Sequence, residues 1–190
     1  EEAGRMSRLI DDLLSLSRVE VDEHIIPDER VALLEVVKSV IASLEPRAAR
    51  RQMGIVLVDD QPSRPNRPVM YGFSDEINEV FHNLIENAIK YGFEGTDIHI
   101  HISAREAGHV RVCVTNTGEV IGENHLGRLT ERFYRVDKAR SRQIGGTGLG
   151  LAIVKHIVNR HRGTIEITSS DEGVTTFAVS LPLIAGQRAL

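Results

Sequence analysis

We predict an α+β protein, a two-layer α/β sandwich of helices packed on a sheet built from antiparallel hairpins. Several long segments carry apolar residues at the spacing of one helix face, and two pairs of shorter segments alternate apolar and polar residues around a glycine-containing turn. The chain has 190 residues, 41% of them hydrophobic, which is enough to form one compact core. Helices in one set and hairpins in another are typical of two packed layers.

The composition argues against several classes of protein. Lys and Arg number 23 against 27 Asp and Glu, so the net charge is −4 and the pI is near 6.1, which argues against nucleic-acid binding along a basic stripe. The single cysteine, Cys113, cannot form an internal disulfide, so we expect a reducing environment. No apolar run approaches the ~18 residues of a membrane span, and no signal peptide begins the chain. Because the first residue is Glu1, we expect the chain to be part of a longer protein.

Residues 1–20 are predicted to form a helix. Met6, Leu9, Leu13 and Leu16 alternate spacings of three and four, which places them on one stripe. Such a stripe suits the seam of a two-helix or coiled-coil pair, and it also suits an amphipathic helix that packs on its own domain. Residues 21–30 break the pattern with a proline and a charge cluster, so we place a junction there.

The remaining elements follow in order. We predict helices over residues 31–51, 74–91 and 147–162, the second with Ser74 as its N-cap and two acidic residues in its first turn. A short buried strand is expected over 55–58, and a proline-rich loop over 61–68. Hairpins are expected over 98–104 with 110–115, and over 164–170 with 175–181. The stretch 118–146 has no regular pattern, and such long loops inside a compact domain are usually functional or disordered.

The glycine loop, residues 145–150, has the sequence GGTGLG and leads directly into the last predicted helix. Glycines let the backbone approach a ligand closely, and the free N–H groups at a helix start suit phosphate. The alternative is a flexible hinge. Upstream, the stretch 128–142 carries six basic residues against two acidic ones, and this local charge suits a polyphosphate, although a solvated loop is the simpler alternative.

The predicted helix 74–91 carries two amides and a cation on one face. Asn83 and Asn87 are four residues apart, and Lys90 and Tyr91 follow one turn later. An amide oxygen is a suitable ligand for Mg²⁺, and Lys90 can reach a phosphate. The alternative is a pair of surface asparagines without a ligand.

Three long motifs occur together in one order. They are NLIENAIKY at 83–91, RFYRVD at 132–137 and GGTGLGLAIV at 145–154. Together they resemble the N box, F box and second glycine box of sensor histidine kinases, and the likeness is greatest to the phosphate-responsive type. The resemblance covers nearly the whole chain. It implies a Bergerat-type ATP-binding fold, with residues 1–22 as the end of a dimerisation and phosphotransfer helix and 23–190 as the ATP-binding catalytic domain.

The resemblance also implies roles for individual residues. By it, Asn87 and Asn83 would hold Mg²⁺, Lys90 and Arg135 would position the phosphates as the catalytic groups, and Tyr91 would line the ribose side. Tyr134, Arg135 and Arg140 would belong to a lid, and the cofactor ATP would also contact Asn116, Gly118 and Ile121. The triphosphate would be surrounded by Gly146, Thr147, Gly148, Leu149, Gly150 and Leu151.

One motif departs from the family pattern. Where the family has Asp-x-Gly-x-Gly-Ile, this chain has NTGEVI at 116–121. In the family that Asp accepts a hydrogen bond from the adenine amino group, and replacing it by Asn116 is expected to cost about 1–2 kcal/mol, or roughly five- to thirty-fold in affinity. Val120 stands at the second glycine, and a positive φ there would cost on the order of 1–3 kcal/mol, unless Gly122 serves in a longer loop.

None of the eight histidines has the sequence context of the family's phosphoacceptor. The resemblance therefore implies a protein-histidine kinase whose acceptor histidine lies outside this chain, in its own dimerisation domain. The implied partners are that domain, a second copy of the protein and a response-regulator aspartate. We expect the cytoplasmic part of a bacterial inner-membrane sensor, attached to the membrane only through upstream segments, with no nucleic-acid partner.

Two alternatives use the same residues. Asn116 and Val120 would suit a degenerate, non-catalytic module that acts through dimerisation or partner binding. The second alternative is an ATPase of the wider gyrase and chaperone superfamily. Those enzymes place a glutamate base where Asn83 stands, and an amide cannot act as a base, so we expect slow net hydrolysis.

Overall fold

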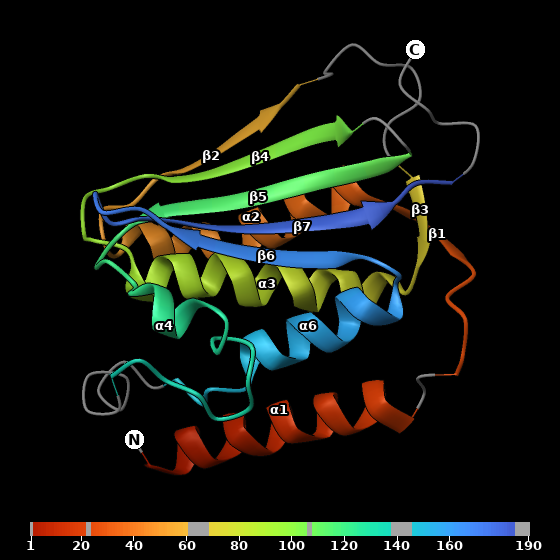
Figure 1. The fold of residues 1–190 in the computed structure, drawn as a ribbon, viewed down its shortest axis with the longest axis horizontal. Helices are drawn as coiled ribbons and strands as arrows, with labels where there is room; N and C mark the ends of the chain where they lie inside the picture. Colours follow the sequence, from red (N-terminus) through yellow and green to blue (C-terminus); the bar gives the residue numbers. More distant parts are fainter. Residues whose placement is uncertain (1, 22–23, 61–68, 106–107, 138–145, 185–190) are drawn as a thin grey trace.

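The computed structural model describes residues 2–21, 24–60, 69–105, 108–137 and 146–184, and it confirms the two-layer α/β architecture (Figure 1). A five-stranded sheet in the order β2-β4-β5-β7-β6 lies over α2, α3 and α6, and α1 lies beneath α6. The helices are α1 (Glu2–Val21), α2 (Leu33–Ala49), α3 (Ser74–Tyr91), α4 (Glu123–Leu126) and α6 (Gly150–Arg160). The strands are β1 (Glu29–Ala32), β2 (Ile55–Asp59), β3 (Val69–Gly72), β4 (Ile98–Arg105), β5 (His109–Thr117), β6 (Thr164–Ser169) and β7 (Val174–Pro182).

Both predicted hairpins are confirmed. β4 pairs with β5 and β6 pairs with β7, each antiparallel, and β5 also pairs with β7. Alternate residues of β5 are buried, because one face of the sheet rests on the helices and the other does not. The turn glycines Gly108 and Gly173 both have φ near +77°, which a glycine adopts without strain.

The first large strand differs from its prediction. β2 pairs with β4 alone, in parallel, so it forms an edge of the five-stranded sheet. Val56 and Val58 are exposed on its outer face, and the expectation of a buried strand was wrong. An apolar run indicates burial, but an edge strand keeps one face toward solvent when only one side of the sheet is covered.

A second, two-stranded sheet was not predicted. β1 and β3 pair antiparallel, with Glu29 opposite Gly72 and Ala32 opposite Val69. Each strand has four residues, too few to show a periodicity, and the partners are far apart in the sequence. As a result α2 begins at Leu33 rather than at residue 31.

The first helix is confirmed, and it packs on α6 of the same chain. Of its predicted stripe, Leu16 is buried, whereas Met6 and Leu13 are exposed. Val19, which is not part of the stripe, is also buried. The C-terminal half of α1 therefore behaves as an amphipathic helix on its own domain. None of the helices in the described ranges is long and apolar enough to cross a bilayer.

The two helices that bear the site differ slightly from prediction at their starts. Ser74 is the first residue of α3, so Phe73 and not Ser74 occupies the N-cap position. The Phe73 N–H donates to His161 Nε2 at 3.1 Å. α6 begins at Gly150 rather than at Thr147, because Gly148 has φ +78° and ends the preceding loop in a turn. The loop 61–68 lies outside the residues that the structure describes.

Candidate functional site

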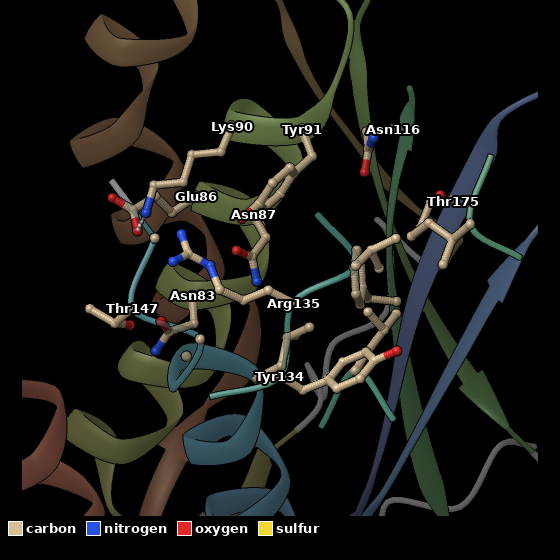
Figure 2. Close-up of a pocket in the computed structure, with 18 of the residues that line it drawn as sticks. Asn83, Glu86, Asn87, Lys90, Tyr91, Asn116, Tyr134, Arg135, Thr147 and Thr175 are labelled. Carbon is tan, nitrogen blue, oxygen red and sulfur yellow. Dashed lines mark hydrogen bonds and ion pairs between the residues drawn. The ribbon is translucent and has the colours of Figure 1, made fainter. Parts of the chain in front are cut away.

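A cavity of about 530 Å³ opens between α3, the start of α6 and one end of the sheet (Figure 2). This volume is typical of small-molecule and cofactor sites. Its lining includes most of the residues that the sequence singled out. They are Asn83, Asn87, Lys90, Tyr91, Asn116, Gly118, Ile121, Tyr134, Arg135, Gly146, Thr147, Gly148, Gly150 and Leu151.

One predicted contact is not found in the cavity lining. Leu149 is fully buried in the core, and only its backbone takes part near the loop, where its N–H donates to the Thr147 hydroxyl at 3.3 Å. Gly122 precedes α4 and does not line the cavity. Arg140 lies outside the described residues.

The α3 wall of the cavity consists of Asn83, Asn87, Lys90 and Tyr91. These side chains line one side of the pocket in Figure 2 because their spacing returns them to the same helical face. Asn83 Nδ2 donates to the Glu79 carbonyl at 3.0 Å, which fixes the amide. A Cβ atom at Gly150 would lie 2.6 Å from Asn83 Oδ1, so a side chain at this position would displace the Asn83 amide.

Lys90 is already paired in this structure. Its ammonium donates to Glu86 Oε2 at 2.7 Å, and Arg47 of α2 pairs with the other oxygen of the same carboxylate. Burial raises the pKa of Glu86, but the hydrogen bonds and charges of Lys90 and Arg47 outweigh it and hold that pKa below its usual value. The sequence analysis missed Glu86 and Arg47, although Glu86 stands four residues before Lys90, the spacing of a helical ion pair.

Arg51 fixes the C-terminal end of α3. Its guanidinium donates to the carbonyls of Lys90 and Gly92, each at 3.1 Å, and these are carbonyls that a helix end leaves without partners. Gly118 then bridges to Gly92, and a Cβ on Gly118 would lie 2.6 Å from the carbonyl oxygen of Tyr91. This close approach explains the glycine at position 118.

The sheet side of the cavity carries a row of polar side chains. Asn116 on β5 lies opposite Thr175 on β7, which lies opposite Ser169 on β6. Asn116 is 4% exposed and Thr175 is 3% exposed, and both line the cavity. The Ser169 hydroxyl lies 3.2 Å from that of Thr175 and accepts the N–H of Ile121 at 3.1 Å. The sequence analysis missed Thr175 and Ser169, because only the strand register brings them beside Asn116.

The strain anticipated at Val120 is absent. Among the residues described, the non-glycines with positive φ are Gln52, Phe133 and Arg162. Val120 therefore needs no glycine-like backbone, and its side chain lines the cavity. The expected cost at this position was wrong.

Residues 128–137, which the resemblance assigns to a lid, are held by contacts around one tyrosine. A hydrogen bond of 2.6 Å joins the Tyr134 hydroxyl and His125 Nδ1, and the Arg128 guanidinium lies 4.3 Å from the centre of the Tyr134 ring. Phe133 N–H donates to the Gly148 carbonyl at 2.8 Å, which joins the lid to the glycine loop. A Cβ on Gly148 would lie 3.0 Å from the Phe133 backbone.

Arg135 extends from the lid toward the α3 wall (Figure 2). Its Nε and Nη2 atoms are buried and have no hydrogen-bond partner within the described ranges, and a Cβ on Gly146 would lie 3.4 Å from Nη2. Buried N–H groups without partners cost free energy unless an acceptor is supplied. The arrangement therefore suits an anionic ligand bound between Arg135, Lys90 and the glycine loop.

The first helix also reaches the cavity. The Thr147 hydroxyl donates to Asp12 Oδ2 at 2.5 Å, and Asp12 lines the pocket. Burial raises the pKa of Asp12, while the hydrogen bond from Thr147 and the charge of Lys90 partly oppose this. The sequence analysis did not anticipate this contact, because residues 12 and 147 meet only in the folded chain.

A cavity with Lys90, Arg135 and a glycine loop on one side and a polar sheet edge on the other suits a nucleotide. Residues 72–185 match the family model described as "Histidine kinase-, DNA gyrase B-, and HSP90-like ATPase". Because the match covers more than half of the chain, the chain belongs to this family. By its similarity to curated sensor histidine kinases, the chain is an ATP-binding catalytic domain of that type.

Two of these relatives are sensor kinases. The chain is 39% identical over 177 residues to the phosphate regulon sensor protein PhoR of Pseudomonas aeruginosa, covering 93% of this chain and 39% of PhoR. It is 35% identical over 181 residues to the sensor-like histidine kinase SenX3 of Mycolicibacterium smegmatis, covering 95% of this chain and 46% of SenX3. The chain thus spans less than half the length of these relatives.

Solved structures confirm the fold. The full-length ShkA complex with AMPPNP superposes with a TM-score of 0.81 at 23% identity, covering 99% of this chain and 38% of ShkA. The mycobacterial sensor histidine kinase MprB superposes with a TM-score of 0.68 at 24% identity, covering 82% of this chain and 97% of MprB. The helix-on-sheet arrangement is therefore shared with histidine kinase domains.

Proposed function

We propose that this chain binds Mg·ATP in the cavity and donates the γ-phosphate to a histidine that lies outside these residues. The observation that carries the proposal is the pair of buried Arg135 nitrogens, Nε and Nη2, which have no acceptor among the described residues and face the α3 wall beside the glycine loop. A triphosphate supplies the missing acceptors. The membership of the chain in a family of ATPases supports the same ligand.

The residues at the phosphate end act by position and charge. Phosphoryl transfer depends largely on alignment and on neutralising the charge of the transferred group. Arg135 binds a phosphate oxygen from the lid side. Lys90 approaches from α3, where Glu86, itself paired with Arg47, holds its ammonium in place. The N–H groups of the glycine loop and the start of α6 complete the phosphate site.

The residues present fit a magnesium ion. Asn87 directs its amide into the cavity from the α3 wall, and neutral oxygen ligands leave room for the phosphates and waters that Mg²⁺ retains. We assign the ligand role to Asn87, with Asn83 beside it held by its bond to Glu79. When bound, the ion neutralises charge on the phosphate chain.

The partners follow from the kinase relatives. We propose that the acceptor histidine lies in the dimerisation domain of the same protein, of which α1 would be the end, and that the phosphate passes on to a response-regulator aspartate. A homodimer attached to the membrane through other segments is the expected assembly. The names of the relatives as sensor kinases support this assignment.

Calorimetric titration of Mg·ATP and Mg·ADP tests the nucleotide site. We expect micromolar to sub-millimolar dissociation constants that require Mg²⁺ and are lost in Asn87→Ala. The matched control is Asn159→Ala, the same change at an exposed amide of α6 outside the cavity, which should bind as the wild type does. Absence of binding at millimolar nucleotide would contradict the proposal.

A turnover assay separates the kinase from a hydrolase. Asn83 cannot act as a general base, so the isolated chain should hydrolyse ATP slowly. The rate of phosphate release should stay well below ~1 s⁻¹, the lower end of typical enzyme turnover numbers. We expect binding without steady hydrolysis, measured as phosphate release under saturating Mg·ATP. Turnover at ~1 s⁻¹ or faster would favour an ATPase instead.

A further inference from the structure

Lys90 reaches the cavity wall with only part of its hydrogen-bonding capacity in use. An ammonium has three N–H donors. One of them donates to Glu86 Oε2 at 2.7 Å, and the other two have no acceptor within the described ranges. Figure 2 shows both side chains on the α3 side of the pocket, which both of them line. A phosphate that binds Lys90 must therefore share it with a carboxylate.

A carboxylate at this place opposes phosphate binding. Its charge holds the Lys90 ammonium back from the ligand, and it repels the phosphate oxygens directly. The side chains of Glu86 and Lys90 are 18% and 14% exposed, so water screens these interactions only in part. The charge of Asp12 also acts on Lys90, and the Thr147 hydroxyl donates to that carboxylate. What this wall offers to an anion consequently depends on how strongly Glu86 holds Lys90.

Arg47 is the second cation that Glu86 binds. It lies in the last turn of α2 and pairs with Glu86 Oε1, the oxygen that Lys90 does not use, and it does not line the cavity. A carboxylate that is shared between two cations holds each of them less firmly than it would hold one alone. Glu86 and Lys90 by themselves would be neutral, whereas the three groups together carry one positive charge. Arg47 thus leaves the α3 wall cationic.

We propose that Arg47 is a positioning residue for the phosphate site, because its pairing with Glu86 from outside the cavity leaves the Lys90 ammonium available to the nucleotide. This inference rests on the proposed binding of Mg·ATP. Arg47 is 39% exposed and lies outside the cavity, so solvent weakens its own attraction for phosphate. Its effect on the nucleotide should therefore require the carboxylate of Glu86.

The test is a double-mutant cycle on the 190-residue chain, with calorimetric titration of Mg·ATP and Mg·ADP. We expect Arg47→Met to raise the dissociation constant of Mg·ATP by about three- to tenfold, since Glu86 then pairs with Lys90 alone. The loss for Mg·ADP should be no larger, because the diphosphate carries less charge.

Glu86→Gln supplies the other side of the cycle. The amide oxygen still accepts a hydrogen bond from Lys90, but the negative charge is gone, so this variant should bind Mg·ATP at least as tightly as the wild type does. Arg47 then has no carboxylate to share with Lys90. Adding Arg47→Met to Glu86→Gln should therefore change the dissociation constant by less than about twofold.

Arg50→Met is the matched control. Arg50 is exposed at the end of the same helix and outside the cavity lining, so this variant removes the same charge and leaves the pair of Arg47 and Glu86 intact. Its dissociation constants should stay within about twofold of the wild type. Equal losses in Arg50→Met and Arg47→Met would indicate a general effect of surface charge and would overturn the inference.

The other outcomes are distinct. A loss in Arg47→Met that persists in the Glu86→Gln background would assign Arg47 a structural role and contradict the inference, as would unchanged binding in Arg47→Met. If Arg47→Met lacks a cooperative urea transition, Arg47→Gln replaces it, because its amide can still donate to Glu86 without a charge; the same loss and the same rescue are expected. If the folded wild type does not bind Mg·ATP at millimolar concentration, the proposed function fails as well.

Discussion

At the scale of single residues, a few glycines determine how closely the backbone segments around the cavity approach one another. Gly150 lies against the Asn83 amide, Gly118 against the end of α3, and Gly148 against Phe133 of the lid. Gly148 is the most constrained of them, because it combines φ +78° with this contact. A side chain at these positions would move a wall of the site rather than only add volume.

Gly148→Ala is therefore expected to lower the free energy of unfolding by roughly 1–3 kcal/mol, since alanine at positive φ is strained and its Cβ would overlap the Phe133 backbone. Nucleotide affinity should fall with it, because the lid is hydrogen-bonded to the Gly148 carbonyl. Urea unfolding and calorimetry measure the two effects.

Gly127→Ala is the matched control for this substitution. Gly127 also lies in the region between β5 and α6, but it has φ −64° and open space around the position of a Cβ. Its effect on stability should stay within about 0.5 kcal/mol. Equal losses in both variants would contradict the assigned role of the Gly148 backbone.

At the scale of elements, the C-terminal end of α6 is tied to the start of α3. His161 is buried, accepts the Phe73 N–H at Nε2 and donates from Nδ1 to the Ile157 carbonyl at 2.8 Å. These bonds require the neutral ring. Arg160 pairs with Glu76 beside it, and Glu76 Oε2 lies 3.8 Å from His161 Nδ1. This cluster holds the two helices that form the site.

Stability should consequently fall in acid. Burial lowers the pKa of His161 below its ordinary value of 6.5, and the charge of Arg160 adds to this against the opposing bond to Ile157. The unfolded chain then takes up a proton more readily than the folded chain. The contribution is complete above pH 6.5 and decreases as the pH falls below that value toward the folded-state pKa.

Urea unfolding between pH 7.5 and 5 measures the effect against His161→Gln, whose amide can still accept the Phe73 N–H. The wild type should lose more stability than the variant over this range. An identical dependence on pH in the two proteins would show that His161 does not contribute.

At the scale of the whole molecule, α1 is attached to the catalytic unit by few contacts. Leu16 and Val19 are buried, and polar contacts join Asp12 to Thr147, Ser15 to Glu79, and Glu20 to Arg132. Between residues 6 and 14 the helix exposes apolar side chains. These are Met6, Ile10, Leu13 and Leu14.

We predict that residues 23–190 fold without α1, as the division at residue 22 implies. Removing α1 takes away the burial of two apolar side chains, and it also removes the entropic cost of ordering the helix. The net effect should be a free energy of unfolding lower by about 1–3 kcal/mol. Circular dichroism and urea unfolding of the shortened chain measure this. A chain that lacks a cooperative transition would show that α1 is part of the same folding unit.

The local patterns of the sequence determined most of the elements and half of the site. The long helix 74–91, both hairpins and the glycine loop were predictable, because each depends on spacing or on turn residues within a short segment. Asn87, Lys90 and Arg135 were identified as site residues through the resemblance of their motifs to those of sensor histidine kinases, and the structure brings them to one cavity.

Only the tertiary structure decided the rest. The β1–β3 pair, the exposed face of β2 and the row formed by Asn116, Thr175 and Ser169 depend on strand register between distant segments. The contact between Asp12 and Thr147, and the pairing of Lys90 with Glu86 and Arg47, depend on how the helices pack. The physical reason is that helix periodicity and turn chemistry act over a few residues, whereas burial and hydrogen-bond partners are set by segments that meet only when the chain folds.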